Sequence, residues 1–267
     1  MPSYEKCVAS LNGEIMPAPQ AMIPVTDEGL LRGDGVFEAV RVYDGVPFRL
    51  EEHLLRLERS ARNLRLPLDL EAVRGEVRQL LSRAGSGEDR PEAVRIVVTR
   101  GGRRIVLTEE LPKLPERIRL GSIAYAPTRV LDGVKSLSYA ANMLARRLAE
   151  EAGFDEALLV TPHGRVLEAT TSSVFWVKAG RLYTPPLSDH ILASITRALV
   201  LDVTDAEERE STLEDVLDAE EVFLASTMRE VHPVAALDAR EYGAETPVTD
   251  AAADAVSRRL ADELAQA

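Results

Sequence analysis

The sequence predicts a two-domain protein of mixed α/β or α+β type. The chain has 267 residues and 45% hydrophobic content, enough for one large core or two smaller ones. Segments that alternate apolar and polar residues are interspersed with segments of helical period. A stretch without any period and with two prolines, 111–115, follows the first part of the chain. We therefore expect a small N-terminal α/β domain, 1–120, and a larger C-terminal mixed β domain with helices, 121–267.

The elements of the first domain follow from turn residues and periodicity. Asn12-Gly13 and Asp44-Gly45 are typical of tight hairpin turns between strands. Leu54, Leu57 and Ala61 recur at helical spacing behind an acidic start. The predicted elements are hairpins at 6–15 and 36–48, helices at 51–64 and 70–83, and a strand at 94–99.

The second domain alternates between helical and extended patterns. The helices are recognised by apolar residues three and four positions apart, and the strands by short runs rich in branched or aromatic side chains. A His163-Gly164 turn separates two of the strands. The predicted elements are helices at 139–151, 191–202 and 250–264, and strands at 156–160, 173–177 and 222–225.

Charge and composition narrow the class of partner. A net charge of -12 and a pI near 5.0 oppose encounter with nucleic acid or an anionic membrane, so a small metabolite is the better candidate. The single cysteine, Cys7, cannot form an internal disulfide and suits a reducing compartment, the cytoplasm. No apolar stretch approaches the roughly 18 residues of a membrane span, and the first residues lack an export signal.

Common catalytic signatures are absent from the sequence. There is no phosphate-binding glycine loop, dinucleotide fingerprint or nucleophile-elbow serine. The four histidines, His53, His163, His190 and His232, lack paired ligand spacing and are interpreted as surface or turn residues. We therefore predict no metal site.

Five short motifs, taken together, carry the functional signal. They are GDGVFE at 33–38 with HLLRL at 53–57, KSLSY at 135–139, LEATTSSVFW at 167–176, SITR at 194–197, and AST at 225–227 with EV at 230–231. Their order and spacing resemble the class IV aminotransferases, which include branched-chain aminotransferases, D-amino acid transaminases and aminodeoxychorismate lyases. The resemblance extends from about residue 11 to residue 237. It implies a fold type IV enzyme that uses pyridoxal 5′-phosphate (PLP).

The resemblance implies a role for each of four side chains. Lys135 matches the lysine that forms an imine with PLP and then shuttles a proton, chemistry that requires an amine able to lose its proton. Arg56 matches the phosphate-binding arginine, Tyr139 the tyrosine that bonds the phenolic oxygen, and Glu168 the acid at the ring nitrogen. Without the resemblance, Arg56 and Lys135 are typical exposed cations, Tyr139 a half-buried tyrosine at a helix start, and Glu168 an ordinary hairpin residue.

The remaining motifs imply phosphate contacts. Ile195 with its backbone amide and Thr196 with its hydroxyl match a phosphate site at a helix N-terminus. Ser226 and Thr227 match hydroxyls and amides that bind phosphate and, for Thr227, also the substrate carboxylate. Plain helix capping and a strand-end turn are the alternatives.

The choice among family activities rests on fewer residues. Ser138-Tyr139 and the Ser226-Thr227 pair favour a transaminase over a lyase. Arg32 and Arg95 match positions at which two guanidiniums could trap an α-carboxylate, which favours a D-amino acid substrate. A branched-chain L-amino acid aminotransferase is the alternative, followed by an aminodeoxychorismate lyase and by a PLP-binding protein without turnover. The resemblance implies amino acid and 2-oxo acid substrates and a homodimer.

Overall fold

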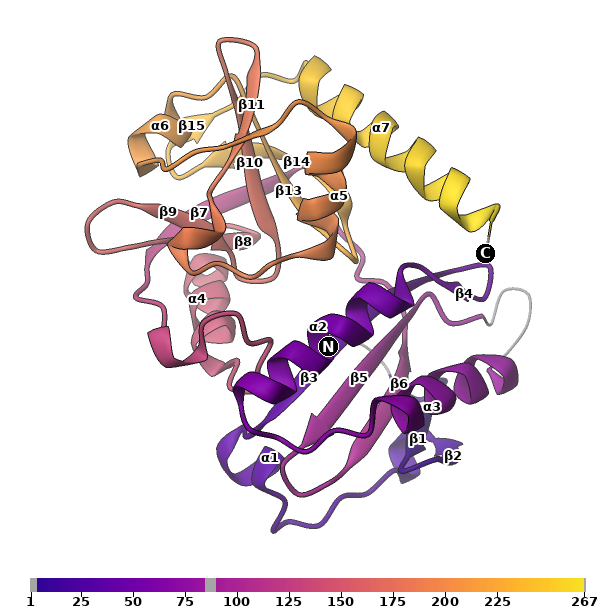
Figure 1. Ribbon diagram of the computed structural model, residues 1–267. Helices are drawn as coiled ribbons and strands as arrows, with labels where there is room; N and C mark the ends of the chain where they lie inside the picture. Colours follow the sequence, from indigo (N-terminus) through magenta and orange to yellow (C-terminus); the bar gives the residue numbers. More distant parts are fainter. Residues whose placement is uncertain (1–3, 85–89, 267) are drawn as a thin grey trace. The chain divides into compact units, whose positions relative to one another are not determined.

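The computed structural model describes residues 4–84 and 90–266 (Figure 1). The chain divides into two compact units. Unit 1 contains the residues up to Pro112 together with Gly133–Tyr139, and unit 2 contains Lys113–Asp132 and Ala140–Gln266.

The segment Gly133–Tyr139 lies with unit 1, although the sequence-based boundary near residue 120 assigns it to the second domain. The reason is a pairing over long sequence separation. Phe37 donates its backbone N–H to the carbonyl of Lys135 at 3.0 Å, and Leu137 donates to the carbonyl of Gly35 at 2.9 Å. A β-bridge joins Val36 to Ser136 between these two bonds. The segment therefore belongs to the edge of an N-terminal strand.

Unit 1 is an antiparallel six-stranded sheet with two long helices. The strand order is β2-β1-β6-β5-β3-β4. The strands are β1 (Val8–Leu11), β2 (Glu14–Pro17), β3 (Gly35–Tyr43), β4 (Val46–Pro47), β5 (Ala93–Thr99) and β6 (Arg104–Glu109). The helices are α1 (Glu28–Arg32), α2 (Leu50–Asn63) and α3 (Leu70–Arg83), with a short η1 (Ala18–Gln20).

One face of this sheet forms the core of unit 1. Val36, Val40 and Ile96 point from the strands toward Leu57 of α2 and Val77 of α3, and all five are fully buried. Because side chains alternate along a strand, Phe37 and Arg95 lie on the opposite face. The two helices thus cover one face, and the other carries Phe37 and Arg95.

Unit 2 is built on a mixed nine-stranded sheet of order β12-β11-β10-β13-β14-β7-β8-β9, with β15 paired to β14. Its strands are β7 (Ile118–Ala124), β8 (Glu156–Val160), β9 (Val166–Ala169), β10 (Ser173–Lys178), β11 (Arg181–Thr184), β12 (Glu207–Glu208), β13 (Glu221–Ser226), β14 (Glu230–Leu237) and β15 (Arg240–Glu241). Its helices are α4 (Ala140–Glu151), α5 (Ile195–Val203), α6 (Leu213–Leu217) and α7 (Pro247–Leu264), with η3 (Arg129–Leu131) and η4 (Leu187–Asp189).

The central strands of the unit 2 sheet are almost completely buried. The parallel strands β7 and β8 are joined through a connection that contains α4, as a parallel pair requires. Trp176 is fully buried in the main core cluster, while Phe175 and Phe223 on neighbouring strands stack with ring centroids 4.9 Å apart. Strands buried on both faces read as continuous apolar runs, and β8 and β13 fit that pattern.

Two predicted helix starts differ from the structure. Helix α5 begins at Ile195 and not at residue 191, because Ser194 accepts the N–H of Arg197 as N-cap and the preceding residues form a loop. Helix α7 begins at Pro247, three residues before the predicted start, with the proline in its first turn. Among the residues that the structure describes, no helix combines the length and apolar character needed to cross a membrane.

Candidate active site

Lys135 lies in unit 1 on the segment that borders strand β3. Its Nζ is 4.5 Å from the centre of the Phe37 ring, and Tyr139 meets the same ring edge-on with centroids 5.4 Å apart. The approach of this segment to the strand requires glycines. A Cβ on Gly35 would come within 2.5 Å of Leu137, and Gly33 has φ +66 with Ser138 against it. The GDG sequence is thus explained by the close packing of the lysine segment.

Beneath the sheet, three polar side chains form a fully buried cluster. Glu38 on β3 has no exposed surface, and its two carboxylate oxygens accept bonds of 2.7 Å from Nε and Nη2 of Arg56 on α2. Nδ1 of His53, also on α2, lies 2.8 Å from Glu38 Oε2. The paired geometry fixes the plane of the Arg56 guanidinium. His53 is 1% exposed, so its interpretation as a surface or turn residue is wrong.

The charge state of this cluster follows from its contacts. Burial raises the pKa of Glu38, but the charge and hydrogen bonds of Arg56 and the hydrogen bond with His53 outweigh burial and bring this pKa to about 2. Burial lowers the pKa of His53. The hydrogen bond and charge of Glu38 raise this pKa, and the Arg56 and Lys135 cations lower it further. The cluster therefore holds a carboxylate and a guanidinium, and its electrostatic field includes Lys135.

Arg95 and Arg32 occupy different environments within unit 1. The Arg95 guanidinium lies 5.6 Å from the centre of the Phe37 ring, which Lys135 also faces, and its Nε donates to Glu109 at 2.7 Å. Arg32, at the end of α1, pairs with Glu28 one turn earlier, and 66% of its side chain is exposed. The structure thus brings Arg95 together with Lys135 and Tyr139 around one ring, whereas Arg32 points to solvent.

In unit 2, Glu168 lies on β9 and holds a loop. Its two oxygens are 3.3 and 3.2 Å from the backbone N–H of Leu192, which donates to the carboxylate. This bond fixes the residues just before helix α5. Burial raises the pKa of the nearby Tyr125, and the negative charge of Glu168 raises it further.

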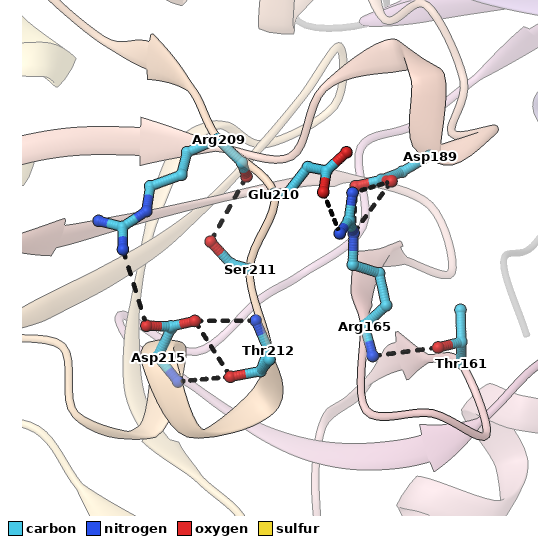
Figure 2. A network of polar contacts seen from close by, with 8 residues as sticks. All are labelled: Thr161, Arg165, Asp189, Arg209, Glu210, Ser211, Thr212 and Asp215. Atoms are coloured by element: carbon cyan, nitrogen blue, oxygen red, sulfur yellow. Dashed lines mark hydrogen bonds and ion pairs between the residues drawn. The ribbon is translucent and has the colours of Figure 1, made fainter.

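The same loop is held from its other end by an ion-pair network (Figure 2). Arg165 donates from Nη2 to Asp189 at 2.6 Å and from Nη1 to Glu210 at 2.7 Å. Asp189 ends η4, and in Figure 2 the Arg165 side chain extends between the two carboxylates. The loop that leads into α5 is therefore fixed at both ends by charged side chains.

The residues of unit 2 that are predicted to bind phosphate lie at two places, the start of helix α5 and the turn after strand β13. Ile195 and Thr196 begin α5, where the first N–H groups of a helix have no partner inside the helix, and Ser194 Oγ accepts only from Arg197. Thr196 is 8% exposed. Ser226 ends β13, and its carbonyl accepts from the N–H of Arg229 at 3.2 Å, which closes the turn that contains Thr227.

A second buried ion pair supports that turn. Arg229 donates from Nη2 to Glu156 on β8 at 2.6 Å, and the two side chains are 6% and 0% exposed. Glu156 also accepts from Thr170 and, at 3.3 Å, from Thr171. Burial lowers the pKa of Arg229, and Glu156 opposes that shift. His232, on β14 beside this pair, is also buried and is not the surface residue expected.

Sequence analysis assigned no role to Glu38, His53, Glu156 or Arg229. Glu38 belongs to the GDGVFE motif, and a charged residue inside an otherwise apolar strand was the available signal. Arg229 and Glu156 are 73 residues apart, and no local pattern links them. Within residues 4–84 and 90–266, no group of three or more His, Cys, Asp or Glu side chains could hold a metal ion.

Each unit, taken by itself, offers groups that suit PLP. Unit 1 offers an amine beside an aromatic ring and a guanidinium whose orientation is fixed by a buried carboxylate. Unit 2 offers a carboxylate on a rigid strand and a nine-residue helix that begins with a hydroxyl side chain at its cap and another in its first turn. An imine-forming amine, phosphate-binding groups and an acid for a pyridine nitrogen are what this cofactor requires.

Comparison with known proteins gives concordant results. The sequence profile of the amino-transferase class IV family matches residues 35–237. A "Putative branched-chain-amino-acid aminotransferase" of Methanocaldococcus jannaschii is 38% identical over 255 residues, which are 86% of this chain and 88% of the relative. D-alanine aminotransferase of Bacillus licheniformis is 31% identical over 258 residues, covering 88% and 90% of the two chains.

Solved structures agree with the sequence relatives. The fold IV transaminase CpuTA1 of Curtobacterium pusillum superposes with a TM-score of 0.83 at 31% identity, over 94% of this chain and 98% of that one. A hypothetical aminotransferase from Mycobacterium tuberculosis in its PLP-bound form gives a TM-score of 0.86 at 26% identity, over 96% and 99%. The chain therefore belongs to the class IV aminotransferases, PLP-dependent transaminases of fold type IV.

Proposed function

We propose that Lys135 is the catalytic lysine of this transaminase. The observation that carries the proposal is the position of its Nζ, 4.5 Å from the centre of the Phe37 ring that Tyr139 and Arg95 also approach. The neutral amine of a lysine is the form that can react as a nucleophile and accept a proton. Lys135 would then bind PLP and carry a proton to and from the substrate Cα.

Other residues would hold the cofactor. Arg56, the backbone N–H of Ile195, the Thr196 hydroxyl and the Ser226-Thr227 turn offer donors suited to phosphate. Glu168 would keep a proton on the ring nitrogen, and the Tyr139 hydroxyl would donate to the phenolic oxygen. When bound, PLP supplies an electron sink that makes the substrate Cα–H acidic.

For the substrate, we propose an amino acid with an aliphatic side chain, with branched-chain L-amino acids as the first candidates. The identity of 38% to the Methanocaldococcus relative supports this choice, and so does the exposed position of Arg32, which leaves Arg95 without a second guanidinium from that helix. A D-amino acid such as D-alanine is the second candidate. Arg95 near the Phe37 ring is the observation that favours it, together with the D-alanine aminotransferase relatives.

A single-turnover experiment tests both levels of the proposal. Purified holoenzyme is mixed separately with L-leucine, D-alanine, L-glutamate and D-glutamate, and the absorption band of the bound cofactor is followed. We expect L-leucine to react fastest, and Lys135→Ala to react with none of them while its circular dichroism spectrum is unchanged. Full activity of Lys135→Ala would refute the assignment of Lys135. A preference for D-alanine would instead support the second candidate. Thr227, Arg32 and Arg95 would then again be candidates for binding the carboxylate of a D-amino acid.

We further propose a homodimer in a reducing, cytoplasmic environment. In unit 1, four apolar side chains between residues 22 and 31 are more than half exposed, which is typical of a surface that another chain covers; they are Met22, Val25, Leu30 and Leu31. The single cysteine, Cys7, supports the reducing compartment. Light scattering coupled to gel filtration measures the mass directly, and a monomer of 29.2 kDa would contradict the dimer.

A further inference from the structure

The face of the unit 1 sheet opposite the two helices carries an ion pair between neighbouring strands. Nε of Arg95 on β5 donates to Oε1 of Glu109 on β6 at 2.7 Å. In the strand register Arg95 pairs with Leu107, so Glu109 is its diagonal neighbour on the same face. The Glu109 side chain is 11% exposed and that of Arg95 is 37% exposed. The carboxylate is thus the better shielded partner, and solvent screens the pair only in part.

This pair lies beside the proposed catalytic lysine. The Arg95 guanidinium and the Lys135 ammonium lie over the same Phe37 ring, at 5.6 and 4.5 Å from its centre. Both residues belong to unit 1, so the arrangement is internal to one compact body. A substrate that takes the place of Lys135 on the cofactor would bring its remaining groups close to Arg95.

The register partners of Arg95 on this face are apolar, while Glu109 on β6 and Arg41 on β3 are its charged diagonal neighbours. Its register partners are Ala39 on β3 and Leu107 on β6, and Phe37 pairs with Val97 one step along the sheet. Ala39, Val97 and Leu107 are each partly exposed. The apolar register partners suit an aliphatic side chain, whereas a guanidinium without a counter-charge beside them would attract a second carboxylate.

We propose that Glu109 is a specificity-determining residue, which neutralises Arg95 and so directs the enzyme toward amino acids whose side chain has no second carboxylate. The inference rests on the proposed function and names the substrate class of the same site. Its physical basis is competition. A dicarboxylic substrate must displace Glu109 from Arg95 and leave this shielded carboxylate without its partner, or else approach it with a like charge. An aliphatic side chain meets neither cost.

The test compares two substrate classes in three variants. In Glu109→Gln the Arg95 charge is no longer neutralised, and we expect the ratio of kcat/KM for glutamate to that for leucine to rise about tenfold or more. Glu110→Gln removes the same charge from the adjacent, exposed residue and should leave the ratio unchanged. Adding Arg95→Gln to Glu109→Gln should abolish the gain. If the Glu109→Gln variant does not fold, Glu109→Thr takes its place, because threonine is favoured in strands.

A binding measurement separates this inference from the proposed function. Dissociation constants of glutarate and 4-methylpentanoate, which cannot transaminate, are measured from the shift of the cofactor spectrum in the same variants. Tighter glutarate binding in Glu109→Gln supports the inference, whether or not wild type turns over the tested amino acids. If wild type turns over none of them, only the proposed substrates are refuted. An unchanged ratio of the two constants, or an equal loss of affinity for both acids, overturns the inference.

Discussion

Substituting Glu38 by glutamine is the sharpest test of the buried cluster in unit 1. Glutamine keeps the shape of the side chain and one acceptor oxygen but removes the negative charge. The substitution leaves the Arg56 guanidinium as a buried cation without its counter-charge. His53 also loses the acceptor that orients its ring. The substitution therefore isolates the charge of Glu38 from its volume.

Two routes give the same magnitude for this loss. Removal of one partner from a buried ion pair typically costs about 3–5 kcal/mol. Independently, the pKa of Glu38 falls from its usual 4.5 to about 2 in the folded protein, which corresponds to about 3 kcal/mol between the charged and neutral forms. At roughly 2–4 °C per kcal/mol for a chain of this size, the melting temperature should fall on the order of 10 °C.

The assay is thermal and urea denaturation of the apoprotein, followed by circular dichroism at neutral pH. Glu58→Gln is the matched control, because Glu58 lies on α2, the helix that carries Arg56, is half exposed, and pairs with Arg62 only at 3.8 Å. Its expected cost is below about 0.5 kcal/mol. Equal melting temperatures for the two variants would refute the argument. The double variant Glu38→Gln with Arg56→Met should recover part of the loss, since it removes the uncompensated cation.

The pH dependence has a definite sign. A carboxyl group whose pKa is lowered by folding stabilises the protein above its unfolded pKa, and this contribution disappears as the pH falls. For Glu38 the loss should extend from about pH 4.5 down to about pH 2. The Glu38→Gln variant lacks this component, so the difference in unfolding free energy between wild type and variant should shrink across that window. If the difference in unfolding free energy stays constant down to pH 2, the partners of Glu38 do not lower its pKa.

Two further predictions concern the cofactor. Arg56→Ala should lose PLP during dialysis faster than wild type, because a charge-assisted contact contributes roughly 1.5–3 kcal/mol; the comparison is made well below the melting temperature of the variant, and equal retention would exclude Arg56 as a phosphate ligand. Glu168→Gln should retain the cofactor but react at least about tenfold more slowly in the half-reaction, because a neutral amide no longer keeps the ring nitrogen protonated. An unchanged rate would show that Glu168 does not keep the ring nitrogen protonated and that its role is to accept the N–H of Leu192.

The sequence predicts those parts of the fold that depend on local signals. The Asn12-Gly13 and Asp44-Gly45 turns give the two expected hairpins, and β8 and α3 match their predicted bounds. The expectation of fold type IV is confirmed by the solved structures that superpose on this chain. The hairpins and α3 satisfy their backbone within a few residues, and β8 is marked in the sequence by its short run of mostly apolar residues.

The parts that were missed depend on distant partners. Residues 191–194 look helical by composition, but the N–H of Leu192 donates to Glu168, 24 residues earlier, and this bond favours a loop. Strand β7 lies beside β8 only after the chain has passed through α4, so nothing nearby signals its pairing. His53 resembles a surface histidine until Glu38 is placed next to it by the sheet. Long-range hydrogen bonds of this kind leave no periodic trace in the sequence.

Buried charge is arranged in the same way in both units, and this arrangement has a functional logic. Glu38 fixes Arg56 in unit 1, and Glu156 fixes Arg229 beside the Ser226-Thr227 turn in unit 2. A buried pair is often no more stabilising than well-packed apolar residues, so stability alone does not explain two of them. Each pair instead holds a predicted phosphate-binding group, or the turn that carries it, in one orientation before any ligand arrives. Preorganised donors bind an anion without the cost of reorganisation. Replacement of the Glu156–Arg229 pair, which contains no predicted phosphate ligand, by apolar side chains of similar volume should therefore preserve the fold and weaken cofactor binding, which a purely structural role would not do.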